Sequence, residues 1–285
     1  MNISSPTTGY EVGKHIGGTE TFTLYECNLK DDKPGIIKIA TASGYNGSLD
    51  REAYILQTMR DKAEAIEAEI AHTDPGKGTF GYRHYFPMLV ESFIDPDQDG
   101  RRISILDLSL DAKKLEELAP ITHLLSRERV RVDPKTSVWI AGRLLKLLDF
   151  AHRQGITVDI NGENILINRD QHFVMIFDWS ESTIVTGEVE TAVASEEISR
   201  AAKEIILALG GDPETGIIPQ DDQLEDEDYQ KILFGLANGG ENNAGEAHRK
   251  FYKYVRSVWP SKFHPFTAYP VRSVETTKTT ETESE

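Results

Sequence analysis

The sequence predicts an α+β fold, with strands in the first third of the chain and helices in most of the remainder. Two observations predict it. Up to about residue 108, short runs rich in β-branched residues alternate with turn residues, and one long stretch of helical spacing lies among them. Beyond residue 110, apolar residues recur at helical spacing over three long stretches. A chain of 285 residues is long enough for one large domain or two lobes.

The first third contains four predicted strands, at residues 21–27, 35–40, 88–94 and 103–108. Turn residues separate the first two strands, and the segment 95–101 joins the last two as a hairpin. Residues 49–70 are predicted to be helical, because their apolar side chains fall on one face and their charged side chains on the other. The order β-β-α-β-β predicts a small, mainly antiparallel sheet with one long helix.

Three helices are predicted in the rest of the chain, at residues 137–152, 196–209 and 246–259. The first is apolar on most faces and is expected to be buried, with His152 at its end packing against the core and bonding to the backbone. Two brief strands are predicted after it, at residues 165–168 and 173–177. The acidic run 221–228 is expected to be a solvated loop or a helix start, and the charged segment 274–285 is expected to be disordered.

Charge and apolar patterning exclude several classes of protein. The chain has 31 Lys+Arg against 47 Asp+Glu, a net charge of −16, so it lacks the overall positive field that nucleic-acid binding needs. No apolar stretch approaches the roughly 18 residues of a membrane span. The single cysteine, Cys27, rules out an intrachain disulfide and is expected to be a buried or edge-strand residue. The expected location is the cytoplasm, with neither a membrane nor a nucleic-acid partner.

One group of polar residues has the spacing of a reactive site. Asp159 is followed five residues later by Asn164, then by a predicted hairpin, and then by Asp178 at the end of a strand. Phosphoryl transfer from a nucleotide needs one carboxylate to orient the attacking hydroxyl, and a second carboxylate with an amide oxygen to hold Mg²⁺. A single Asp in a loop is more often a solvated or capping residue, so the joint spacing carries the prediction.

These residues make the chain resemble the protein kinase fold. Asp159 and Asn164 match the Asp-x4-Asn of its catalytic loop, and Asp178 matches the Asp of its Asp-Phe-Gly motif. Lys38 matches the lysine of the third strand, and Glu52 the glutamate with which that lysine pairs. The resemblance implies that ATP and Mg²⁺ are bound, with Asp159, Lys38 and Glu52 in the catalytic set and Asn164 and Asp178 as metal ligands.

The resemblance also implies a nucleotide cleft between two lobes. Gly17 and Gly18 lie where the family's glycine-rich loop covers the phosphates, and Asp107 and Leu108 lie where backbone groups of residues 107–109 would hold the adenine. The expected division is an N-lobe at 1–108, a C-lobe at 109–271 and a disordered tail at 272–285.

The second half of the chain is also similar to a group of bacterial serine/threonine kinase-like domains that occur beside J-domains or alone. Residues 196–213 and 258–265, with Phe266, carry this similarity. Several members of that group lack the catalytic-loop Asp or Asn, whereas this chain has both.

The chain departs from the kinase pattern at several positions. Thr19 and Phe22 replace the second and third loop glycines, and Ser180 replaces the glycine after Asp178. Asn161 replaces a lysine near the transferred phosphate, which leaves Lys38 as the only cation that the pattern directs at the phosphates. Trp179 is expected to pack beneath the helix at 49–70.

Two functions therefore stay open. The first is an ATP- and Mg²⁺-dependent phosphotransferase, whose hydroxyl acceptor is a protein or a small molecule. The second is a weak or inactive pseudokinase that acts as a nucleotide-binding scaffold or as an interaction module. It is motivated by the replaced loop glycines, by Asn161 and Ser180, and by the short segment after Asp178 that normally holds a peptide substrate.

Overall fold

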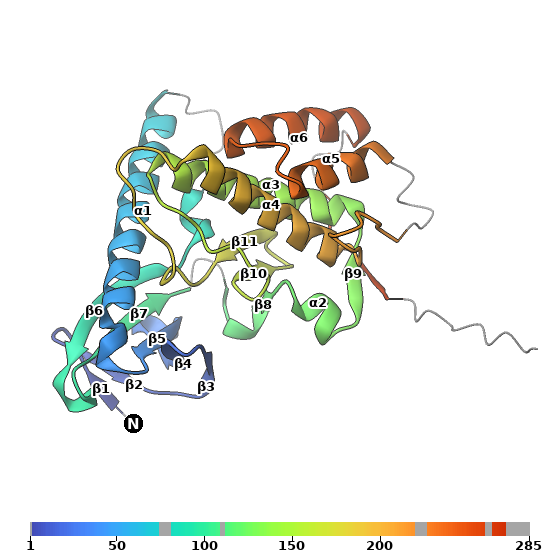
Figure 1. Cartoon of the computed structure of the whole chain (residues 1–285). Coiled ribbons are helices and arrows are strands. Elements are labelled where there is room, and N and C mark those ends of the chain that lie inside the picture. Colours follow the sequence, from blue (N-terminus) through green and yellow to red (C-terminus); the bar gives the residue numbers. More distant parts are fainter. Residues whose placement is uncertain (1, 74–80, 109–111, 220–226, 260–263, 272–285) are drawn as a thin grey trace, which may run out of the picture.

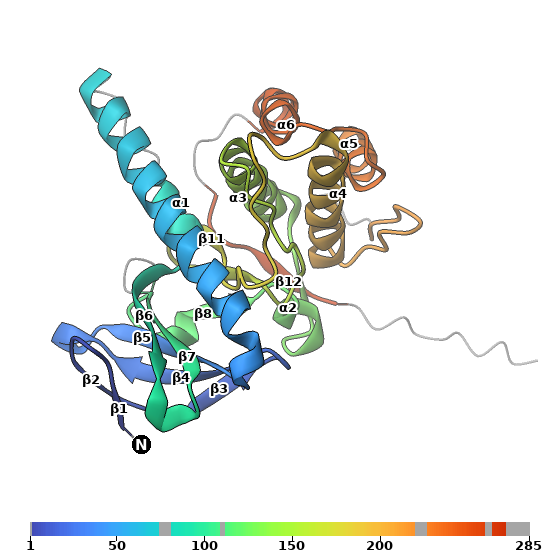
Figure 2. The same cartoon turned by 60° about the vertical axis from the view of Figure 1, so that its left-hand side comes forward.

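The computed structural model describes residues 2–73, 81–108, 112–219, 227–259 and 264–271, and it is an α+β structure (Figure 1). The α+β class predicted from the sequence is confirmed. A sheet and one long helix lie on one side of the molecule, and a group of helices lies on the other (Figure 2). This arrangement is compatible with two lobes. The predicted tail at 272–285, Ser109 of the predicted adenine region and residues 221–226 of the acidic run lie outside the described residues.

The main sheet is antiparallel and five-stranded, in the order β3-β4-β5-β7-β6. Its strands are β3 (His15–Gly18), β4 (Phe22–Asn28), β5 (Pro34–Ala40), β6 (Met88–Asp95) and β7 (Arg101–Asp107). Four of them lie within two residues of the predicted ranges. The fifth, β3, was not predicted as a strand. A separate hairpin of β1 (Asn2–Ser4) and β2 (Gly9–Glu11) was also missed.

The two faces of the sheet are covered by different elements. Successive side chains of a strand point to opposite faces, so β5 sends Ile37 and Ile39 to one face and Ile36, Lys38 and Ala40 to the other. Ile37 and Ile39 pack with Ile3 and Tyr10 of the hairpin. On the opposite face, α1 (Asn46–Thr73) packs against β6 and β7 and places Leu56 and Met59 in the main core. Lys38 therefore points toward α1.

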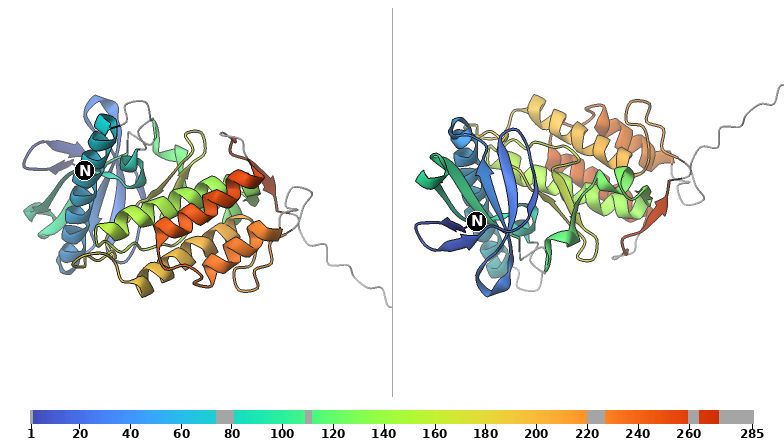
Figure 3. Two further views of the ribbon diagram at one scale, coloured as in Figure 1. Left: turned by 90° about the horizontal axis from the view of Figure 1, so that it is seen from above. Right: turned by 90° about the horizontal axis from the view of Figure 1, so that it is seen from below.

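The remaining described chain contains four helices of 11 or more residues. They are α3 (Pro134–Arg153), α4 (Thr191–Ala208), α5 (Glu227–Ala237) and α6 (Ala244–Val258). Helix α3 packs against α4 and α6, and α4 packs against α5, so the helices lie side by side (Figure 3). Asp133 caps α3 by accepting a bond from the Thr136 N–H, and Pro134 occupies its first turn. Helix α3 is buried as predicted, and α4 begins five residues earlier than predicted.

Short strands join the helices to the site described below. Strands β10 (Ile165–Asn168) and β11 (Phe173–Ile176) form the predicted hairpin. Strand β8 (Leu118–Pro120) pairs with β10, and β9 (Val130–Val132) pairs with β12 (Ala268–Pro270) near the short helix α2 (His123–Ser126). In the described ranges, none of the helices has the length and apolar character needed to cross a membrane.

The Cys27 thiol is buried near the end of β4, as expected, and burial raises its pKa to about 12. Because the thiolate is the reactive form, we predict that native protein at pH 8 is not alkylated by iodoacetamide over an hour, whereas protein in urea is alkylated fully. Intact mass measured over time checks this, with a free-cysteine peptide as the control. Rapid labelling of the native protein would contradict the buried position.

Candidate functional site

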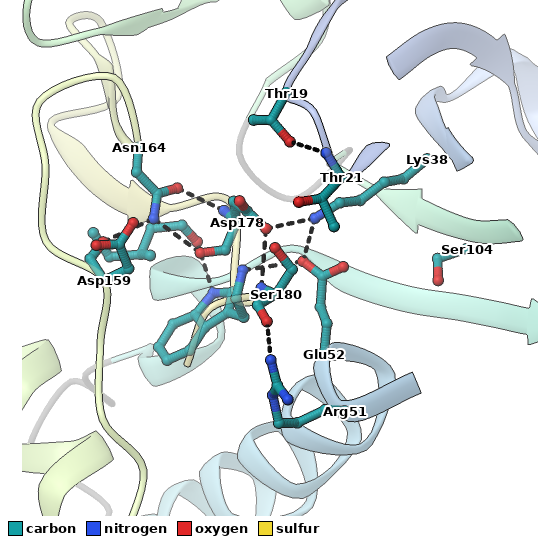
Figure 4. Close-up of polar contacts among 12 residues, drawn as sticks. Thr19, Thr21, Lys38, Arg51, Glu52, Ser104, Asp159, Asn164, Asp178 and Ser180 are labelled. Atoms are coloured by element: carbon teal, nitrogen blue, oxygen red, sulfur yellow. Dashed lines mark hydrogen bonds and ion pairs between the residues drawn. The ribbon is translucent and has the colours of Figure 1, made fainter. Parts of the chain in front are cut away.

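The ammonium group of Lys38 lies at the centre of a buried ion cluster (Figure 4). Its Nζ is 2.7 Å from Glu52 Oε1 and 2.6 Å from Asp178 Oδ1. The Lys38 side chain has no solvent exposure and that of Glu52 has 1%, whereas Asp178 keeps 19%. A strand, a helix and a loop therefore each contribute one residue to this cluster. The pairing of Lys38 with Glu52 was expected from the resemblance, whereas the contact between Lys38 and Asp178 was not.

Helix α1 fixes the position of Glu52. The residue lies on the helix face that packs against the core, where Leu49, Ala53 and Leu56 are also buried. Its Oε1 accepts a second bond, of 3.0 Å, from the Trp179 backbone N–H, so α1 also holds the segment after β11. Burial raises the pKa of the Glu52 carboxyl, and the charge of Lys38 opposes that shift.

Asp178 lies two residues after the end of β11 and is held in its ionised form. Burial alone would raise the pKa of its carboxyl, but the Lys38 ammonium and hydrogen bonds from Ser180 lower it below the usual value. The Ser180 N–H donates to Asp178 Oδ1 over 3.0 Å, and Arg51 Nη2 donates to the Ser180 carbonyl over 2.5 Å. Trp179 is fully buried in the main core, with its ring 6.5 Å from that of Phe86 and perpendicular to it (89°), and its backbone N–H bonds to Glu52 of α1.

Asn164 ties the loop 159–164 to Asp178. Its Oδ1 accepts the Asp178 N–H over 2.6 Å, and its Nδ2 donates to the carbonyls of Asp159 and Asp178, each over 2.9 Å. Asn161 Nδ2 donates to Asp159 Oδ2 over 2.7 Å and so orients that carboxylate. Asp159, Asn164 and Asp178 therefore lie together, because the Asn164 side chain bonds to backbone groups of both aspartates.

Helix α4 supports the same loop through a buried carboxylate. Glu197 Oε1 accepts the Val158 N–H over 2.9 Å, and its Oε2 is 2.7 Å from His152 Nε2. The expectation that His152 bonds to the backbone is thus wrong, because its ring nitrogen bonds to this carboxylate. His152 and Glu197 thus join the end of α3 to α4. Through the Val158 N–H, Glu197 also holds the chain one residue before Asp159.

Arg200 is a second cation near the site, and the sequence did not predict it. Arg200 of α4 places Nη1 3.9 Å from Asp159 Oδ1 and also pairs with Glu196. Arg200 follows Glu197 by three residues, so both lie on one face of the helix. The three-residue spacing of Glu197 and Arg200 in the predicted helix could have indicated that both side chains face the loop that carries Asp159. Lys38 is therefore not the only cation near the predicted reaction centre, although Arg200 is half exposed.

The ring of Phe22 covers the remaining side of Lys38. Its centroid is 3.8 Å from Lys38 Nζ, a cation–π contact, and the Phe22 side chain is buried. Gly17 and Gly18 lie in β3 with φ of +149° and +154°. A Cβ at Gly18 would come within 2.4 Å of the Phe22 carbonyl oxygen, so glycine is needed there. The β3–β4 turn thus carries Phe22 onto the lysine.

The predicted adenine region is described only up to residue 108. Asp107 ends β7 and pairs in register with Gly35 of β5. Leu108 is buried, its N–H donates to the Pro34 carbonyl over 3.4 Å, and its carbonyl accepts the Ala112 N–H over 3.0 Å. Both backbone groups of Leu108 are therefore already bonded within the protein.

The donor set of Asp178 and Asn164 fits Mg²⁺. An ionised carboxylate and an amide oxygen are hard ligands, and Mg²⁺ usually takes one or two such groups with waters and substrate phosphates. Asn164 Oδ1 has a second lone pair beyond the one that Asp178 N–H occupies. In the ranges that the structure describes, no group of three or more His, Cys, Asp or Glu side chains forms a metal site.

Comparison of the whole chain with protein-family models and with curated proteins finds no match. The chemistry of the site is therefore inferred from its geometry.

Breaking the buried cluster should destabilise the fold. We predict that Lys38→Met lowers the free energy of unfolding by about 3–5 kcal/mol, because two carboxylates stay close together without their cation. The double variant Lys38→Met/Glu52→Gln should lose less than the sum of the two single changes, by about 1 kcal/mol or more. Urea unfolding measures both.

Arg60→Gln is the matched control, because Arg60 pairs with Glu64 on the exposed face of α1, the helix that carries Glu52. Its loss should change the unfolding free energy by about 0.5 kcal/mol or less. Equal effects of Lys38→Met and Arg60→Gln would contradict the buried cluster.

Proposed function

We propose that this protein is an ATP- and Mg²⁺-dependent phosphotransferase of the serine/threonine protein kinase-like type. The observation that supports it most is the convergence of Lys38, Glu52 and Asp178 at one buried ion cluster. The loop of Asp159 and Asn164 is bonded to the same Asp178. Five polar residues with kinase-like spacing in the sequence are thus neighbours in space. A chance similarity of sequence would not bring them together.

Each residue has a role in the proposed reaction. Lys38, oriented by Glu52, would bind phosphate oxygens of the nucleotide. Asp178 and Asn164 would hold Mg²⁺, which neutralises charge on the phosphates when it is bound. Asp159 would orient the acceptor hydroxyl and accept its proton. Asn161 holds Asp159 by a hydrogen bond, and Arg200 adds positive charge beside that carboxylate.

A second candidate function is a pseudokinase scaffold, and the surroundings of Lys38 favour it. Glu52, Asp178 and the Phe22 ring surround its ammonium, which has no solvent exposure. A phosphate can reach Lys38 only if Phe22 or Asp178 moves. A site that stays in this arrangement would bind partners through its surface and catalyse nothing.

Two measurements separate these functions. A ligand at 100 times its dissociation constant adds about 2.7 kcal/mol to stability, so Mg·ATP should raise the melting temperature of the wild type. This rise should be smaller in Lys38→Met, compared with and without nucleotide so that the variant's own instability cancels. We further predict ATP-dependent phosphate transfer by the wild type, measured as autophosphorylation by mass spectrometry.

Asp159→Asn is the control for catalysis, because it keeps the side-chain size at a position that is one-third exposed. It should bind Mg·ATP as the wild type does and lose at least about 100-fold in rate. A wild type no faster than Asp159→Asn would contradict the enzyme and leave the scaffold. No thermal shift with Mg·ATP would contradict the enzyme and a nucleotide-binding scaffold, and would leave a module that binds partners without nucleotide.

The position of Phe22 makes a separate prediction. Phe22→Leu keeps an apolar side chain in the core but removes the ring from Lys38, so Mg·ATP should bind several-fold more tightly. Isothermal titration calorimetry measures the dissociation constant. Phe93→Leu, a buried phenylalanine on the opposite face of the sheet, is the matched control and should leave it unchanged. Weaker binding by Phe22→Leu would contradict the view that the ring obstructs the site.

A further inference from the structure

A cavity of about 480 Å³ lies between α3 and α6 and shares no lining residue with the Lys38 cluster. The two helices lie side by side in Figure 3. The turn after β10 contributes His172, and the segment before β12 contributes His264. A cavity of this size suits a small organic molecule.

The lining of this cavity is strongly basic in an acidic protein. Four cations and three histidines line it, with no carboxylate among the described lining residues: Lys135, Arg143, Lys146, Arg256, His172, His248 and His264. The whole chain has a net charge of −16. Positive charge is therefore concentrated at one concave place, where it would attract an anion.

The basic groups of the cavity act on one another. Burial, the nearby Lys146 and, to a smaller extent, Arg256 together lower the pKa of His248 to about 4. Burial also lowers the pKa of Lys146, with Arg143 as the next cause. An anion in the cavity would relieve this repulsion.

Three carboxylates lie near the basic groups of the cavity. Asp149 raises the pKa of Lys146 and His248 but is outweighed, and its Oδ1 accepts a hydrogen bond from Arg153. Asp133 bonds to His264 and also caps α3. Asp170 raises the pKa of His172, whose net shift is still downward because of burial, His264 and Arg143.

Aromatic side chains form part of the remaining walls, together with Val138, Gly142 and Val255. Trp139, Trp259 and Tyr252 line the cavity, and the rings of Trp139 and His172 lie 5.3 Å apart. In the described part of the chain, the buried Trp139 Nε1–H has no acceptor, and an unmade bond of this kind is unfavourable. Flat apolar walls beside cations suit a planar group attached to a phosphate.

We propose that this cavity binds a small phosphorylated ligand with a planar apolar part, of the nucleoside phosphate class. The phosphate lies among the Lys and Arg side chains, and the planar group lies against the indoles. The site is separate from the proposed phosphotransferase site and does not depend on it.

The chain's three tryptophans allow a test that reports each site separately. Trp139 and Trp259 line the cavity, whereas Trp179 lies beside Glu52. We expect AMP, titrated into the full ¹⁵N-labelled chain, to shift the indole N–H signals of Trp139 and Trp259 saturably. Inorganic phosphate should bind there at least about tenfold more weakly than AMP, and adenosine should not saturate the shift.

The variants are chosen on exposed residues so that the fold is kept. The double variant Lys135→Gln/Arg256→Gln should weaken AMP binding at these two indoles at least about tenfold. Lys253→Gln is the matched control, because Lys253 is exposed on α6 but does not line the cavity, and it should change nothing. An unsaturable shift, or equal affinity in wild type and double variant, would overturn the proposal. If AMP bound no more tightly than phosphate, the proposal that the ligand has a planar apolar part would be overturned.

Discussion

The burial of the Lys38 ammonium is the constraint on which the rest of the structure depends. A fully buried cation is very costly unless opposite charges surround it, and here Glu52 and Asp178 lie within hydrogen-bond distance. Those two carboxylates come from α1 and from the segment after β11. Satisfying one lysine therefore fixes the sheet, the long helix and the loop relative to one another, and Trp179 N–H adds a further bond to the same Glu52.

The same constraint is the basis of the proposed function. A buried lysine between two carboxylates can exchange a partner for the phosphates of a nucleotide, and Asp178 is the more exposed of the two carboxylates. Glu52 is almost fully buried and would keep the lysine in place. The Phe22 ring is the opposing element, because it occupies the side of Lys38 that a phosphate would approach. Whether the protein is an enzyme or a scaffold depends on how readily Phe22 and Asp178 move.

Much of the sheet and the long helices could be predicted from the sequence, because strands such as β5 and helices such as α3 carry a clear apolar period. The three-residue strands β8, β9 and β12 have no such period and exist only through pairing with distant residues. Asp159, Asn164 and Asp178 were predicted from their spacing, and Lys38 and Glu52 from the resemblance to the kinase fold. The contacts of Phe22, Arg200 and His152 were not, since each depends on tertiary packing between elements.

The most direct test of the account is a crystal structure of the protein with Mg²⁺ and a non-hydrolysable ATP analogue. The account predicts a phosphate oxygen within hydrogen-bond distance of Lys38 Nζ, Glu52 still paired with that lysine, and one Mg²⁺ in contact with oxygens of Asp178 and Asn164. The Phe22 ring should have left the face of Lys38. A structure at saturating nucleotide in which Lys38 still bonds only to Glu52 and Asp178, with no phosphate near it, would contradict the account.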